Sequence, residues 1–328
     1  MQNKISLIYF LSLISVLLLT CLIESRLIPY LRQKAKQPIY KEGPSWHDSK
    51  SGTPTMGGLA FVIVVAFACT CCAFYLRYNG YGYESLSLLS GIIFCTFNSV
   101  IGIIDDLTKI RRKQNAGLSP KQKLLLQTIF AIIYLFSRAQ YLADGTSVNL
   151  FGRVFDFGYA YYPLALLILL GITNCANLTD GVDGLAASVA FCIGCIGFFF
   201  NATHNYDAAI FSIMLIGGGI GFLIFNINPA KIFMGDTGSL FFGALVCTTV
   251  FSMRAPVISI ILGIVYVIEG ASVIIQVLCF KTTGRRIFKM APLHHHLEKC
   301  GANESKICLI AVIATLLVSV IAYIVSGM

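Results

Sequence analysis

The residues best suited to chemistry in this sequence lie in short polar stretches between long apolar ones. The stretch Asn174–Gly184 holds Asn174, Asn177, Asp180 and Asp183, with no lysine or arginine among them. A single aspartate such as Asp183 commonly caps the helix that follows it. Four oxygen-bearing side chains in one short loop favour ligand binding over capping alone.

Further carboxylates follow other apolar runs. Asp105 and Asp106 are adjacent, and Asp236 stands between Gly235 and Gly238. Two neighbouring carboxylates raise a pKa or attract a cation. The alternatives are a solvated helix end paired with its basic neighbours for the first pair, and a tight turn that caps the next helix for Asp236.

Basic groups and imidazoles accompany these acids. Ser119 and Pro120 predict a helix start, which places Lys121 in a first turn. The histidines His294, His295 and His296 are consecutive, so they point in different directions, and their spacing does not suit zinc.

The elements that must position these groups are membrane helices. The chain of 328 residues is 57% hydrophobic and only 12% charged, its mean hydropathy is +0.79, and soluble domains carry about 25% charged residues. A membrane span needs about 20 mostly apolar residues. The ten runs that we predict to span are Ser6–Ile23, Met56–Leu76, Ser85–Ile104, Leu124–Phe136, Tyr159–Cys175, Leu185–Phe200, Ala208–Phe225, Leu240–Met253, Pro256–Phe280 and Ile307–Ile324.

The distribution of charge predicts the topology. The loops after the odd-numbered runs carry 19 of the 24 lysines and arginines, so the positive-inside rule places these loops in the cytoplasm and both termini outside. The net charge of +9 therefore reports topology and not nucleic-acid binding. The cysteines lie mostly in apolar runs and are interpreted as packing residues. We predict one all-α polytopic membrane domain over residues 1–328.

Two features inside the spans have alternative interpretations. Glu269 lies in the middle of the ninth run, where a carboxylate is costly, so it is either functional or pairs across helices. The glycines Gly217, Gly218, Gly219 and Gly221 have no preceding strand and indicate close helix contact, not a phosphate loop.

The predicted topology brings the polar loops to one side of the membrane. Independent helix caps would not need to share a side. Carboxylates and amides without thiolates favour Mg2+, whose coordination is often completed by substrate phosphates. The basic groups suit a polyphosphate, and the bilayer suits a lipid co-substrate, so the residues predict Mg2+-dependent phosphoryl transfer at the cytoplasmic face.

Five motifs together resemble the phospho-N-acetylmuramoyl-pentapeptide transferase family, a branch of the polyprenyl-phosphate N-acetylhexosamine-1-phosphate transferases. They are Pro54–Gly58, Asp105–Asp106, Asn177–Gly184, Phe233–Ser239 and Ala291–His296. The resemblance implies transfer of phospho-MurNAc-pentapeptide from its UDP carrier to undecaprenyl phosphate, giving lipid I and UMP in peptidoglycan synthesis. It also implies a ten-helix fold in the bacterial plasma membrane and a homodimer.

The resemblance assigns roles to matching positions. It implies that Asp236 binds magnesium and that Asp105, Asp106, Lys121, His294 and His295 are catalytic. The implied uridine pocket contains Lys50, Thr55, Asp180, Asp183, Asn226 and Phe233, with Phe233 stacked on the uracil. Asn174, Asn177 and His296 complete the predicted substrate-binding residues.

Two other functions compete with this prediction. A sister enzyme would move GlcNAc-1-phosphate to the same lipid, but the sister families carry a different histidine motif. A transporter could use Glu269 as a proton site, but transporters place titratable groups near the midplane of repeated halves. Here the acids gather at helix ends, and the sequence has no convincing internal repeat.

Overall fold

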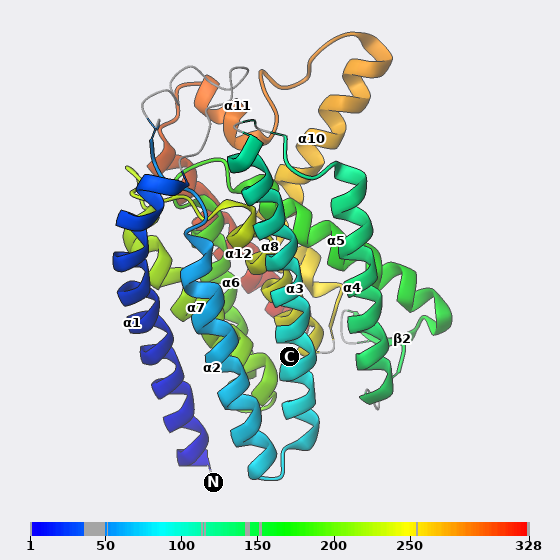
Figure 1. Ribbon diagram of the computed structural model, residues 1–328. Coiled ribbons are helices and arrows are strands. Elements are labelled where there is room, and N and C mark those ends of the chain that lie inside the picture. The colour runs from blue at the N-terminus through cyan, green and yellow to red at the C-terminus, as the bar shows by residue number, and fades with distance from the viewer. Residues whose placement is uncertain are drawn as a thin grey trace.

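The computed structural model describes residues 2–35, 50, 52–112, 114, 116–141, 145–150, 153–253 and 255–326. Every predicted site residue lies within these ranges. The described chain is a bundle of helices with one small hairpin (Figure 1). The predicted all-α class is therefore confirmed.

The apolar runs form long helices because a backbone in hydrocarbon satisfies its hydrogen bonds only within a helix or a closed barrel. Seven helices in the described ranges are long and apolar enough to cross a membrane, and α6 is a shorter apolar helix. The predicted count of ten spans remains a prediction. The helices are α1 Gln2–Lys34, α2 Gly58–Tyr78, α3 Gly82–Arg112, α4 Pro120–Tyr141, α5 Tyr161–Thr179, α6 Leu185–Asn201, α7 Tyr206–Asn226, α8 Gly235–Ser252, α9 Ile258–Leu262, α10 Ile264–Thr283, α11 Leu293–Lys299 and α12 Glu304–Ser326.

Several predicted segments differ from the observed helices, and the first run, predicted as Ser6–Ile23, extends over Gln2–Lys34. The fourth run, predicted as Leu124–Phe136, extends over the 22 residues of α4. The residues at both ends of α4 are largely polar, so the apolar run alone understated the length of the helix. The ninth run, predicted as one helix over Pro256–Phe280, is divided at Gly263 into α9 and α10.

Helix α8 lies at the centre of the bundle. All its residues from Thr237 to Ser252 are buried, because α2, α3, α5, α6 and α7 pack around it. The outer helices instead expose large apolar side chains, among them Phe10 of α1 and Phe67 of α2. A membrane protein presents such apolar side chains to lipid. Its polar side chains therefore gather in loops at the ends of the helices, where a functional site is expected.

The glycines of α7 make the predicted close helix contacts. A Cβ on Gly217 would lie 2.9 Å from Val16, and one on Gly221 would lie 2.8 Å from Thr20, both on α1. Strands β1 (Ser147–Leu150) and β2 (Arg153–Asp156) form an antiparallel hairpin. In Figure 1 the hairpin and the N-terminus lie toward the end of the bundle away from α11.

Candidate active site

Two of the sequence motifs are joined through their backbones. Phe233 N–H donates to Pro54 C=O at 2.8 Å, and the N–H groups of Gly57 and Gly58 donate to Phe233 and Met234 at 2.9 and 3.1 Å. A Cβ on Gly58 would lie 2.4 Å from the Gly238 backbone. Gly58 therefore serves close packing between the start of α2 and the start of α8.

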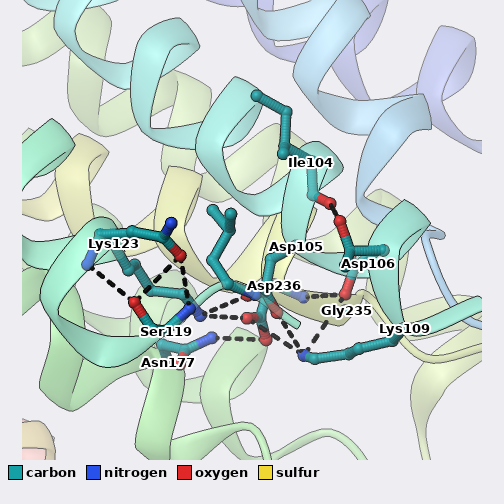
Figure 2. A network of polar contacts seen from close by, with 12 residues as sticks. Ile104, Asp105, Asp106, Lys109, Ser119, Lys123, Asn177, Gly235 and Asp236 are labelled. Carbon is teal, nitrogen blue, oxygen red and sulfur yellow. Dashed lines mark hydrogen bonds and ion pairs between the residues drawn. The ribbon is translucent and has the colours of Figure 1, made fainter. Parts of the chain in front are cut away.

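Three carboxylates form an acidic cluster, which we define as Asp105, Asp106 and Asp236. One oxygen from each lies within 4.8 Å of the other two. Asp105 and Asp106 lie near the C-terminal end of α3, which the distribution of lysine and arginine predicts to face the cytoplasm. Asp236 lies in the first turn of α8 (Figure 2). Their burial excludes a solvated helix end for the α3 pair, because Asp105 and Asp106 are only 1% and 3% exposed.

Asp106 caps the helix that carries Asp236. Its carboxylate accepts hydrogen bonds from Asp236 N–H at 3.2 Å, Thr237 N–H at 2.9 Å and Thr237 Oγ1 at 2.7 Å. The turn allows this approach because Gly235 has φ 68° and a Cβ there would lie 2.5 Å from Asp106 Oδ2. Asp106 thus satisfies the first amides of α8 and leaves the Asp236 carboxylate free of the capping role.

Two lysines are ion-paired with the acidic cluster. Lys109 Nζ lies 2.6 Å from Asp105 and 3.2 Å from Asp236. Lys123 Nζ lies 2.5 Å from Asp236 and 3.5 Å from Asp105. Figure 2 shows both side chains converging on Asp236.

The structure places Lys121 differently from Lys123. Lys121 is exposed in the first turn of α4, and the contacts described for the acidic cluster come from Lys123. Residues two apart on a helix point about 200° apart, so only one of the two can face the acids. Sequence reasoning missed Lys123, although it lies one helical turn before buried Gln127 and so continues the inward face of α4. The start of α4 was predicted correctly, since Ser119 Oγ and Gln122 Oε1 satisfy each other's N–H groups.

The asparagines of the polar stretch belong to helix α5, which continues to Thr179 and replaces the first half of the predicted turn. Asn177 Nδ2 donates to Asp236 Oδ1 at 3.0 Å and to Ser239 Oγ at 2.8 Å. Asn174 Nδ2 instead donates to Gln127 Oε1 at 2.9 Å. Asn177 therefore orients the acidic cluster, while Asn174 connects α5 to α4.

A second cluster is built around Lys50. Lys50 Nζ lies 2.7 Å from Asp183 Oδ1 and 2.7 Å from Glu304 Oε2, and Glu304 Oε2 also accepts from Asp183 N–H at 2.8 Å. Burial alone would lower the pKa of Lys50, but these two carboxylates outweigh it and raise the pKa. Glu304 of α12 was missed by sequence reasoning, because nothing in its own surroundings resembles a motif.

Asp183 does not cap helix α6. Its Oδ2 accepts from Asn228 Nδ2 at 3.1 Å and from Ala230 N–H at 3.0 Å, and Gly184 is the N-cap residue. The carboxylate therefore fixes the loop before α8 to the loop after α5.

Phe233, Thr55 and Asn226, three other predicted uridine-pocket residues, have different surroundings. Lys50 Nζ lies 5.9 Å from the centre of the Phe233 ring. Thr55 is buried at 6% exposure, and a Cβ on Gly235 would lie 2.9 Å from its hydroxyl. Asn226 accepts from Gly184 N–H at 2.9 Å and donates to Ile232 C=O at 2.8 Å, so its side chain connects these loops to one another.

Asp180 interacts electrostatically with charged groups of both clusters. Burial, followed by the charges of Asp236, Asp106 and Asp183, raises its pKa well above the ordinary value for an aspartate, and Lys50 only partly opposes this. A carboxyl group in this setting holds its proton at higher pH than a solvated one.

The three histidines have three different surroundings. His294 is fully buried, and its Nδ1 lies 3.1 Å from Glu269 Oε2. His295 Nδ1 lies 2.6 Å from Glu298 Oε2. His296 Nδ1 accepts from Lys289 N–H at 3.1 Å, so this ring holds the preceding loop.

The acidic cluster suits a hard divalent cation. Its donors are carboxylate oxygens, which Mg2+ prefers, and they converge from two helices. Two ammonium groups already lie within ion-pair distance of Asp236, which shows that the convergent negative charge needs positive compensation. Asp236 and Asp105 have the oxygens best placed for a metal, since those of Asp106 are used by the start of α8.

Comparison with known proteins defines the class first. Residues 85–255 match Glycosyl transferase family 4, and this range contains the acidic cluster and the Asp180–Asp183 loop. The chain is thus a transferase of this family.

A narrower match and three relatives then define the branch. Residues 50–62 match the phospho-N-acetylmuramoyl-pentapeptide-transferase signature 1. The transferases of that name from Bacillus mycoides (strain KBAB4) and Bacillus thuringiensis (strain Al Hakam) are each 42% identical over 289 residues, which cover 85% of this chain and 86% of theirs. The one from Halalkalibacterium halodurans is 41% identical over 303 residues and 92% of each chain. The chain belongs to the phospho-N-acetylmuramoyl-pentapeptide transferase family, as its motifs predicted.

Proposed function

We propose that this chain transfers phospho-MurNAc-pentapeptide from UDP-MurNAc-pentapeptide to undecaprenyl phosphate, which gives lipid I and UMP in peptidoglycan synthesis. Membership of the family supports the reaction. The single structural observation that carries it is the acidic cluster with its two lysines and Asn177. This arrangement provides oxygen ligands for Mg2+ and positive groups for phosphates in one place.

The proposal includes a location and an assembly. The chain acts as a multi-pass protein of the bacterial plasma membrane with its site on the cytoplasmic face. The concentration of lysine and arginine in the loops that carry the site supports this orientation. The active unit is a homodimer, as the family resemblance implies.

In the proposed reaction a phosphate oxygen of the lipid attacks the phosphorus that bears the sugar. A new P–O bond forms to the lipid phosphate, the P–O bond to UMP breaks, and UMP leaves with the electron pair. Mg2+ held by Asp236 and Asp105 would supply charge stabilisation at the pyrophosphate oxygens. Lys109 and Lys123 would add positive charge beside the same oxygens, and Lys50 with Phe233 would hold the uridine end.

Asp105 could act in the reaction in one of two ways, as a base or as a group that orients the lipid phosphate or the metal. A phosphate monoester has a second pKa of about 6, so the nucleophile is largely ionised at pH 7 without a base. Asp105 also accepts a hydrogen bond from Leu118 N–H at 2.8 Å and pairs with Lys109. Both observations support an orienting role. If Asp105→Asn kept full turnover at pH 8 and lost activity only below pH 6, the base role would be restored.

The first test is release of UMP by the purified protein in detergent with undecaprenyl phosphate and UDP-MurNAc-pentapeptide. We expect UMP only with Mg2+, and none from Asp236→Ala, whose elution and melting temperature must match those of the wild type. UDP-GlcNAc in place of the donor separates the sister activity. A folded, lipid-supplied protein that releases no UMP from either donor would rule out the transferase proposal and favour transport.

A further inference from the structure

Glu269 is a membrane-embedded acid that the proposed reaction leaves without a role. It lies in the second turn of α10 and is 5% exposed. A carboxylate at such a position is rare and usually functional or paired. The sequence left open a proton site for transport and a structural cross-helix pair.

The partner of Glu269 is the first histidine of the triple run. Glu269 Oε2 accepts a hydrogen bond from His294 N–H at 3.1 Å and lies 3.1 Å from His294 Nδ1. His294 is 0% exposed. One carboxylate oxygen therefore holds both the backbone and the ring of His294, which fixes the rotation of the ring as well as its place.

The other ring nitrogen of His294, Nε2, points toward the Asp180–Asp183 loop. His294 Nε2 is buried and has no hydrogen-bond partner among the described residues. A Cβ on Gly181 would lie 2.3 Å from this atom, so Nε2 rests against the backbone between Asp180 and Asp183. The ring of His295 is 4.2 Å away, centre to centre. An unpartnered buried nitrogen is costly unless a ligand completes it.

We infer that Glu269 is a positioning residue that keeps the proton of His294 on Nδ1 and thereby presents Nε2 to the bound donor substrate at the Asp180–Asp183 loop. A backbone N–H can only donate, so the same oxygen of Glu269 acts as an acceptor, and the ring nitrogen beside it carries its proton as a second donor. A carboxylate behind one imidazole nitrogen selects the tautomer and stabilises the ring if it gains a proton. Nε2 then accepts from an N–H or O–H of the substrate, or donates to a phosphate oxygen once protonated.

The other buried membrane glutamate provides a matched control. Glu24 of α1 is 0% exposed, and both of its oxygens lack a hydrogen-bond partner in the described part of the chain. Replacing it by glutamine removes a buried carboxyl group from a membrane helix without touching a histidine. A general effect of such a replacement would appear in both variants, whereas a positioning effect would appear only in Glu269→Gln.

The test combines a spectroscopic and a kinetic measurement. Protein labelled with 15N in its histidine rings is examined by NMR in detergent, and the His294 signals are assigned by their loss in His294→Asn. We expect wild-type His294 to carry its proton on Nδ1, Glu269→Gln to change that tautomer, and Glu24→Gln to leave it unchanged. We also expect Glu269→Gln to lower kcat by about 10- to 100-fold, the range for loss of a carboxylate behind a metal-bound histidine, and Glu269→Asp to restore part of it.

The tautomer measurement and the kinetic measurement test different statements, so a negative result in one can be told from a negative result in the other. The kinetic part rests on the proposed function, whereas the tautomer does not need turnover. A wild-type proton on Nε2 would overturn the inference whatever the Glu269 variants do. An unchanged tautomer in folded Glu269→Gln, or equal kinetic losses in Glu269→Gln and Glu24→Gln, would also overturn it. A correct tautomer without any UMP release would count against the proposed function only.

Discussion

The most informative prediction concerns Glu304, which no sequence motif marked. Its Oε2 lies 2.7 Å from Lys50 Nζ and 2.8 Å from Asp183 N. Replacing Glu304 by glutamine keeps an acceptor oxygen and the side-chain length but removes the charge. Because both contacts belong to the proposed uridine pocket, we expect weaker binding of the UDP donor.

The magnitude follows from these two contacts. A hydrogen bond to a charged group contributes about 1.5–3 kcal/mol, and one between neutral groups about 0.5–1.5 kcal/mol. Glutamine ends the ion pair with Lys50 but keeps a bond to the charged ammonium, and it turns the bond from Asp183 N–H into a neutral one, so the loss is about 2 kcal/mol. The Lys50 and Glu304 side chains are 18% and 14% exposed, so solvent reduces the loss to about 1–2 kcal/mol. This corresponds to a factor of about 5 to 30.

The assay is UMP release at varied donor concentration with the lipid saturating. We expect KM for the donor to rise about 5- to 30-fold with kcat nearly unchanged, because the pocket contributes equally to the ground state and the transition state. The control is Glu84→Gln, which changes another first-turn glutamate at the far end of α3 from the acidic cluster. A fall in kcat at constant KM, or equal effects in the two variants, would refute the reasoning.

Three further predictions concern the acidic cluster and its neighbours. Lys123→Met should lower kcat by about two orders of magnitude, since it removes a half-buried charge that pairs with Asp236, and Lys121→Met should have the smaller effect. The reverse order of kcat values would restore the role predicted for Lys121. Asp180→Asn should raise the melting temperature at pH 8. The raised pKa of Asp180 means that the folded state binds the carboxyl proton more tightly than the unfolded state does. The stabilisation from this proton is complete below about pH 4 and is lost as pH rises through the folded pKa. A gain that stays constant down to about pH 4 in thermal scans would contradict this. Gly181→Ala should lower kcat in a folded protein, because its Cβ would lie 2.3 Å from a His294 ring already held by Glu269; unchanged kinetics would show that the ring can move.

Lys123, which pairs with the acidic cluster, illustrates which site residues the sequence could predict and which it could not. Membrane helices place polar residues inward and apolar ones outward. In α4 the buried residues Gln127, Ala131, Tyr134 and Arg138 follow a helical period, while Leu125 and Ile132 are exposed. Extending that period backward gives Lys123. The signal was present in the sequence, but the family resemblance assigned the role to Lys121, and the apolar run predicted for this helix begins only at Leu124.

Glu269 and Glu304 show the limit of the sequence. Each lies in an apolar or unremarkable segment, and each acquires its role from a partner 25 or 254 positions away. No local spacing encodes such a pair, because the partners meet only after α10, α11 and α12 have packed together. Likewise, the cap of α8 comes from Asp106 on α3 and not from its own loop.

The sequence by itself determined the membrane class, the helix-forming segments and the chemical types at the site. Hydrophobicity and residue type are local properties, and each motif carries its own carboxylates, amides or imidazoles. The tertiary structure alone decided which of them converge, which lysine faces Asp236, which carboxylate holds His294 and which one completes the Lys50 cluster. Those choices depend on how far each helix is rotated about its axis and on where it crosses its neighbours, and packing across the whole bundle sets both.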